Sequence, residues 1–168
     1  MVDMLLLQTV SIVVASAGVF AAAIYYIFQI RNQTRIRKTD FVTKLASTWN
    51  SKEYAEASFR VLLLEFKDYE DFVKKYGGIP SLNPDSIACR MVATFFEHVG
   101  MLLRKKLVEP DLIFDLFLVK DSWKKLKPLI EGLRKQNNSP RLLEWFEYLY
   151  NEEQKREQKL QQSKPSAC

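Results

Sequence analysis

In the segment RMVATFFEHVGMLLRKK, residues 90–106, Glu97 stands next to His98, the only histidine of the chain. A carboxylate and an imidazole can work as a general acid–base pair or bind a metal ion. On a helix, adjacent side chains point about 100° apart, so these two need further ligands to hold one ion. The sequence contains no H-E-x-x-H motif, Cys-x-x-Cys pair or Glu-x-x-His repeat to supply them. We therefore expect no metal, no cofactor and no enzymatic activity.

Glu97 is the more informative member of the pair. The apolar residues of its segment recur at steps of three and four, which predicts a helix with one buried face. Glu97 points away from the centre of that face, between the small residues Ala93 and Gly100, which leave room for a second helix. A carboxylate buried there needs a cationic partner, because an unpaired buried charge is costly. The candidate cations are Arg90, Arg104 and Arg134. An enzyme with a carboxylate site around Glu97, Glu109 and Asp111 is the alternative.

A modest basic strip lies further along the chain, beside Trp123. It consists of Lys124, Lys125, Lys127, Arg134 and Lys135. Such a strip can bind the phosphates of a nucleic acid, but acidic residues are interspersed and the net charge of the chain is only +5. Solvated helix faces explain these cations better, so we do not expect nucleic acid as a partner. A membrane-tethered binder of nucleic acid or anionic lipid is a second alternative.

Helices must position these side chains, and the strongest helical signal lies near the N-terminus. From Met4 to Ile30 the chain contains no charged residue. A helix of that length extends about 40 Å, enough to cross a hydrocarbon layer of about 30 Å. A cleaved signal peptide and a buried helix of a soluble protein are the alternatives. Signal peptides, however, carry positive charge before the apolar stretch, whereas Asp3 stands there. We therefore predict a transmembrane anchor in residues 1–30.

A cluster of cations follows the apolar stretch, in a juxtamembrane segment of residues 31–39. Its members are Arg31, Arg35, Arg37 and Lys38. Such residues stay on the cytoplasmic side, so we predict a single-pass protein of the cytoplasmic membrane, with its N-terminus outside and its C-terminal domain in the cytosol. The same cations are expected to contact anionic lipid, at about 1 kcal/mol per charge. Two distant cysteines, Cys89 and Cys168, form no disulfide framework and agree with a reducing compartment.

One face of the predicted membrane helix consists of small residues. They are Ser11, Ala15, Gly18 and Ala22, at steps of four, three and four. Within a bilayer, small residues allow two helix backbones to approach closely. This face therefore predicts packing against a second copy of the chain or another membrane protein.

The remaining sequence consists of apolar stripes at helical spacing, separated by residues that start or stop helices, such as Asp68, Gly77 and Asn83. No stretch shows the sustained alternation of a strand. The predicted fold is all-α, with a single N-terminal transmembrane helix followed by a cytosolic bundle of about five to six helices in residues 40–150. Residues 151–168 are charged and rich in glutamine, and we expect a disordered tail there.

An ordered series of residue types resembles the pattern of a known protein family. The series begins with two aromatics and Glu, continues with Gly, an acid that starts a short helix, Trp, Ile and Arg, and ends with Phe-Glu-x-Leu. In this chain the corresponding residues are Phe95, Phe96, Glu97, Gly100, Asp111, Trp123, Ile130, Arg134, Phe146, Glu147 and Leu149. Over residues 35–150 this order resembles a family of uncharacterised small prokaryotic proteins known as a domain of unknown function. Its members carry N-terminal membrane helices and a cytosolic helical domain, and the family has no assigned activity. The resemblance implies that Glu97 and Arg134 are structural partners that link two helices.

These observations predict a membrane-anchored helical protein that acts as a protein-interaction or membrane-complex module. The expected partners are membrane lipid and another protein, or a second copy of the chain. Either protein partner would bind through the membrane helix or through the bundle.

Overall fold

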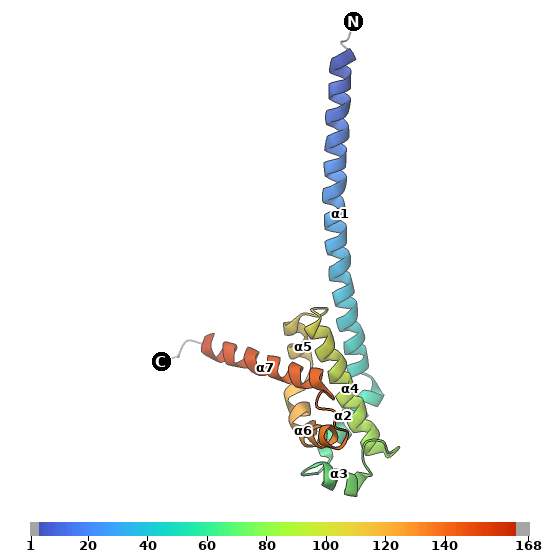
Figure 1. The fold of residues 1–168 in the computed structure, drawn as a ribbon, viewed down its shortest axis with the longest axis vertical. Helices are drawn as coiled ribbons and strands as arrows, with labels where there is room; N and C mark the ends of the chain where they lie inside the picture. The colour runs from blue at the N-terminus through green and yellow to red at the C-terminus, as the bar shows by residue number, and fades with distance from the viewer. Residues whose placement is uncertain (1–3, 164–168) are drawn as a thin grey trace. The chain divides into compact units, whose positions relative to one another are not determined.

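A computed structural model describes residues 4–163, and every regular element among them is an α-helix. The helices are α1 (Met4–Trp49), α2 (Lys52–Leu63), α3 (Tyr69–Tyr76), α4 (Pro84–Arg104), α5 (Pro110–Leu116), α6 (Val119–Gln136) and α7 (Glu144–Ser163) (Figure 1). The prediction of an all-α fold is therefore confirmed. The chain divides into two compact units between Asp40 and Phe41, within α1.

The first unit is the N-terminal part of α1, and its side chains from Leu6 to Arg37 are all exposed. Hydroxyl groups in this part bond back to the helix. The hydroxyls of Ser11 and Ser16 donate to carbonyl oxygens four residues earlier, at 2.9 and 2.7 Å. These polar groups are therefore satisfied without a partner outside the helix.

Two described helices, α1 and α4, have the length and apolar composition needed to cross a bilayer. In α4, 56% of the apolar stretch is buried, so this helix is a core helix of the second unit. In α1 the corresponding share is 0%. The apolar part of α1 lies near the N-terminus, where a signal sequence passes the same test of length and composition.

In the second unit, α4 forms the centre of the core. It packs most extensively against α7 and α2, while α6 packs against α3 and α7. The buried residues of α4 are Ser86, Ala88, Cys89, Val92, Ala93, Phe95, Phe96, Val99, Gly100 and Leu103. Aromatic rings extend this core to the end of α1, where the ring centroid of Trp49 lies 5.1 Å from that of Tyr54 and 5.8 Å from that of Phe95. Such rings bury large apolar areas and dominate core energetics.

Local capping residues set the ends of the shorter helices. Asp68 accepts a hydrogen bond from the backbone N–H of Asp71 at the start of α3, and Gly77 ends that helix in the left-handed conformation, with φ of 82°. Asn83 caps α4, which has Pro84 in its first turn. These side chains satisfy N–H groups that have no partner within the helix, which is why the local sequence identifies the helix starts.

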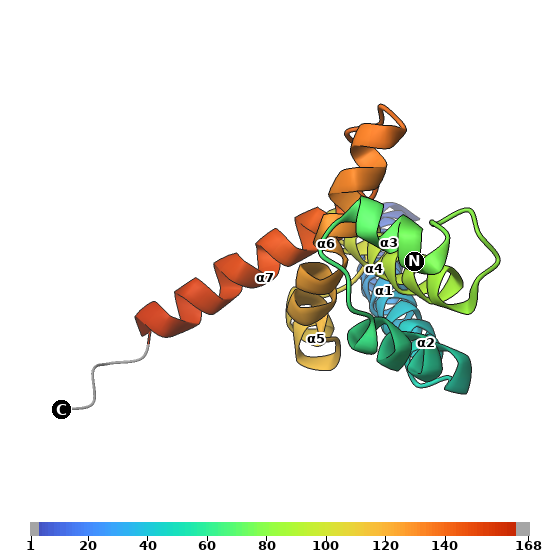
Figure 2. The same ribbon diagram turned by 90° about the horizontal axis from the view of Figure 1, so that it is seen from below.

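The charged C-terminal segment is helical, so the prediction of a disordered tail is wrong for residues 151–163. Arg156 of α7 pairs with two carboxylates of α5, Asp111 at 3.0 Å and Asp115 at 2.8 Å. These pairs link α5 to a segment that has too few apolar residues for a core of its own. Beyond them, the last turns of α7 project away from the other helices of the unit (Figure 1, Figure 2). Residues 164–168 lie outside the described residues.

Candidate functional site

The carboxylate of Glu97 on α4 reaches the first turn of α7. Its Oε2 accepts the backbone N–H of Phe146 at 2.8 Å, and the backbone N–H of Trp145 donates to the same carboxylate. Because α7 begins at Glu144, both amides belong to a turn in which N–H groups have no partner within the helix. Glu97 therefore caps α7 from a different helix, at the positive end of the α7 dipole.

Burial raises the pKa of Glu97 above its ordinary value of 4.5, and the nearby Glu144 adds to the rise. The amide hydrogen bonds lower the pKa, because they stabilise the charged carboxylate. A raised carboxyl pKa is also typical of catalytic acids. Here, however, the carboxylate is engaged by backbone amides of α7, which makes a structural role the simpler assignment.

Arg134 of α6 binds the same region of the chain. Its Nε donates to the carbonyl oxygen of Leu142 at 2.8 Å, and its Nη1 pairs with the carboxylate of Glu147 at 2.7 Å. The predicted ion pair between Glu97 and Arg134 is therefore wrong, because in the described structure each side chain binds groups around the start of α7 instead. The two residues still link helices, through this shared turn.

Gly100 and Phe96 bring α4 and α7 into close contact. A Cβ atom at position 100 would lie 2.6 Å from the carbonyl carbon of Trp145, so glycine permits this approach of the two backbones. The ring of Phe96 stacks on that of Phe146, with centroids 4.9 Å apart and planes inclined by 13°. We call the cluster of Phe96, Glu97, Gly100, Arg134, Trp145, Phe146 and Glu147 the α4–α7 junction.

His98 is exposed on α4, whereas the neighbouring Glu97 is half-buried. It lines a hollow of about 450 Å³ together with Ser51, Arg90 and Thr94. Among residues 4–163, no group of three or more His, Cys, Asp or Glu side chains is placed to hold a metal ion.

The residues predicted to contact the membrane lie in the first unit. Lys38 is half-buried and the other three cations are exposed: Arg31, Arg35 and Arg37. The face of small residues is exposed as well: Ser11, Ala15, Gly18 and Ala22. A Cβ added at Gly18 would meet open space, so nothing among residues 4–163 packs against this position.

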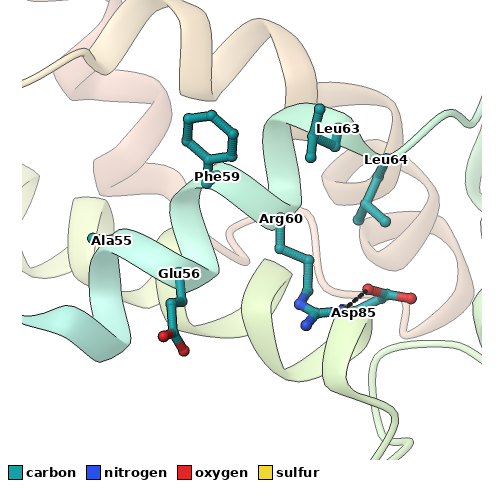
Figure 3. Close-up of a pocket in the computed structure, with 7 residues that line it drawn as sticks. All are labelled: Ala55, Glu56, Phe59, Arg60, Leu63, Leu64 and Asp85. Carbon is teal, nitrogen blue, oxygen red and sulfur yellow. Dashed lines mark hydrogen bonds and ion pairs between the residues drawn. The ribbon is translucent and has the colours of Figure 1, made fainter.

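The second unit has a shallow groove along α2, with a volume of about 660 Å³. Figure 3 shows Phe59 and Leu63 projecting from α2 at this groove, and Arg60 reaching Asp85 on α4. The ion pair between Arg60 and Asp85 measures 3.1 Å. Phe59 is 67% exposed and Leu63 is 70% exposed. Large apolar side chains that are exposed together mark interaction surfaces.

A second hollow lies between α3, α4 and α6 and is more enclosed, with a volume of about 540 Å³. Its floor is buried and almost entirely aliphatic, formed by Cys89, Ala93, Leu126, Leu129, Ile130 and Leu133. Val73 of α3 and the loop around Gly78 line its sides, and Arg90 and Gln136 contribute polar groups. We call this hollow the α3–α4–α6 cavity.

Residues 12–152 match the model of one protein family, described as a domain of unknown function (DUF4760). The chain belongs to the DUF4760 family. The matched range includes the α4–α7 junction, the α2 groove and the α3–α4–α6 cavity, and the resemblance predicted from the sequence is confirmed. No curated protein and no solved structure matches the chain.

Two structural residues of this DUF4760 domain were not predicted from the sequence. A Cβ at Gly132 of α6 would lie 2.6 Å from the Cγ of Tyr69, so α3 packs directly on the backbone of α6. Glu153 of α7 accepts the backbone N–H of Lys120 in the first turn of α6, as Glu97 does for α7. A glycine inside a helix costs about 1 kcal/mol relative to alanine, and this cost is a signal that points to Gly132. Capping by a distant glutamate has no comparable signal.

Proposed function

We propose that this DUF4760 protein is anchored in the cytoplasmic membrane by α1 and binds another protein through the α2 groove of its cytosolic domain. The anchor is supported by the exposed, apolar N-terminal part of α1, residues 6–30, and by the hydroxyl groups of Ser11 and Ser16, which bond within the helix. In hydrocarbon, such a helix satisfies all of its backbone polar groups. The cations Arg31, Arg35 and Arg37 then stay on the cytosolic side and contact anionic headgroups.

The observation that carries protein binding is the exposure of Phe59 and Leu63 at one groove, at 67% and 70%. These side chains lie four residues apart, so they project from one side of α2. Burying them in a partner would remove apolar area from water at about 25 cal/mol per Å².

The charges at the groove indicate the chemistry of the partner. Arg60 is already paired with Asp85. Glu56 also lines the groove, and its only ion pair among the described residues is a long one, 3.7 Å from Lys52, with both side chains largely exposed. Such an exposed pair is weak, which leaves the carboxylate available. A partner segment with apolar anchors and one cation matches this surface.

Crosslinking of the full-length chain in native membranes tests the proposal. Wild-type protein is expected to give a crosslinked species that contains a second, different polypeptide. The double variant Phe59→Ser, Leu63→Ser should lose it. The matched control is Leu82→Ser, because Leu82 is 84% exposed but lies outside the groove. A wild-type protomer that never crosslinks would contradict the proposal, as would equal crosslinking of the double variant. A crosslinked species of two identical chains would show that the partner is a second copy of the chain and not a different protein.

A further inference from the structure

The α3–α4–α6 cavity combines an apolar interior with one unpaired cation. Its floor is formed by aliphatic side chains of α6 and by Cys89 and Ala93 of α4. Burial raises the pKa of the Cys89 thiol to about 12, so this group is uncharged at neutral pH. The floor therefore offers contacts to hydrocarbon and no charge. Its volume of about 540 Å³ also lies within the range of small-molecule sites, roughly 300–1,000 Å³.

Arg90 supplies the positive charge of this cavity. It is an exposed residue of α4 that lines both this cavity and the hollow beside His98, which places it at the rim rather than on the floor. Within residues 4–163, no hydrogen bond or ion pair engages the Arg90 guanidinium, and no Asp or Glu lines the cavity. An anion bound at the rim would accept hydrogen bonds from the N–H groups of the Arg90 guanidinium, and no carboxylate of the cavity would compete for them.

We propose that the α3–α4–α6 cavity binds a single-chain fatty acid, with the carboxylate at Arg90 and the hydrocarbon chain over the floor formed by α4 and α6. The charge of the rim selects an anion, and the aliphatic floor selects a chain without polar groups. The hydroxyl of Tyr69 donates to the side-chain oxygen of Gln136, so this acceptor of the lining already has a partner. This site is separate from the α2 groove and does not depend on a protein partner there.

Photolabelling of the full-length protein in membranes tests this site. The probe is a fatty acid with a diazirine in its chain, and labelled peptides are mapped after trypsin digestion. We expect labelling of residues 126–134, which supply much of the floor, measured relative to labelling of α1 as an internal reference for bulk lipid contact. Laurate should compete for the α6 label. Dodecyltrimethylammonium, which has the same chain length and the opposite charge, should not.

Two variants separate the charged rim from the apolar floor. Arg90→Gln removes a charge-assisted contact and should lower the ratio of α6 to α1 labelling about tenfold. Arg104→Gln is the matched control, because Arg104 lies on the same helix but outside the cavity, and it should leave the ratio unchanged. Val73→Trp should abolish the α6 label by filling the cavity from α3, where Val73 is 37% exposed. Melting curves check that each variant folds.

Three results would overturn the proposal. The first is an α6 to α1 ratio that Val73→Trp leaves unchanged, because the label would then not come from the cavity. The second is equal labelling of wild type and Arg90→Gln, which would remove the anion from the proposal. The third is competition by the cationic amphiphile as strong as that by laurate.

Discussion

Glu97 caps the N-terminus of α7 as Asp68 caps that of α3, but Glu97 does so from a helix distant in sequence. Asp68 caps the amide of Asp71 within its own segment. Glu97 caps amides at Trp145 and Phe146 of another helix. The start of α7 therefore depends on the packing of α4, and formation of the two helices is coupled through one carboxylate. Removing that carboxylate while keeping the backbone intact isolates its contribution.

We expect Glu97→Ala to lower the free energy of unfolding by about 1–3 kcal/mol, because it leaves two N–H groups without an acceptor. Glu97→Gln should lower it by much less, because the amide oxygen still accepts hydrogen bonds at nearly the same position. Chemical unfolding of both variants at pH 7 makes the comparison. An alanine variant as stable as the wild type would show that water satisfies these amides and that Glu97 is not a cap.

The pH dependence of stability gives an independent test of Glu97. Its pKa in the folded protein is raised above 4.5, so the folded state keeps the proton over a range in which the unfolded chain releases it. The contribution of this group to stability is therefore largest at acid pH and is lost as the pH rises from about 4.5 through the raised pKa. Glu97→Gln should remove this part of the pH dependence, measured as the difference between wild-type and variant unfolding curves. A pH-independent difference would contradict the assignment.

At the scale of helices, the backbones of α4 and α7 are in close contact at Gly100, which lies against the carbonyl group of Trp145. An alanine inside a helix normally stabilises it by about 1 kcal/mol relative to glycine. At this position the added Cβ would overlap the Trp145 carbonyl group, which is backbone and cannot rotate away. We therefore expect Gly100→Ala to reduce the free energy of unfolding by about 1–3 kcal/mol, the reverse of the intrinsic preference.

The control for this prediction is the same substitution at Gly18, where a Cβ would meet open space within the chain. Gly18→Ala should leave the unfolding of the second unit unchanged. Chemical denaturation followed by tryptophan fluorescence measures both variants, because Trp145 lies at the α4–α7 junction. A Gly100→Ala variant as stable as the wild type would mean that α7 can shift away from α4 at little cost.

Features set by neighbouring residues could be predicted from the sequence, and features set by distant contacts could not. The stop at Gly77 and the start at Asn83 follow from local capping chemistry, and both are confirmed. The local sequence offers Asp121 as a capping residue for α6. The helix instead begins at Val119, and Glu153 from α7 supplies an acceptor for its first turn. No local pattern contains that information.

The candidate site was predicted with the same limits. The importance of Glu97 and Gly100 could be predicted, because a polar and a small residue interrupt one side of a helix. The partner of Glu97 could not be predicted, because it is a backbone N–H group, and such groups are not associated with any particular residue type. The charged side chains leave three candidates, Arg90, Arg104 and Arg134, and the family resemblance implies Arg134, whose own partner is Glu147. Similarly, Arg156 finds its carboxylates on α5, more than a helix away in the chain.

At the scale of the whole molecule, the proposed function requires α1 to remain in the membrane with the second unit in the cytosol. Thiol labelling tests this arrangement, because Cys89 is buried and its pKa is raised to about 12, so it reacts slowly. In a Cys168→Ser background, single cysteines placed at Met4 and Lys124 would report on the two sides. Both positions are exposed in the structure.

With a membrane-impermeant maleimide, we expect the cysteine at position 4 to react in intact cells and the cysteine at position 124 to react only after permeabilisation. The charge asymmetry is the physical reason, since moving the cations after Ile30 across the membrane is costly. Labelling of position 124 in intact cells would place the second unit outside. A mature chain that lacks position 4 would identify α1 as a cleaved signal. The first result would contradict the cytosolic location of the second unit, and the second would contradict the membrane anchor. Either one would rule out a cytosolic partner at the α2 groove. The capping role of Glu97 would be unaffected, because it rests on contacts within the second unit.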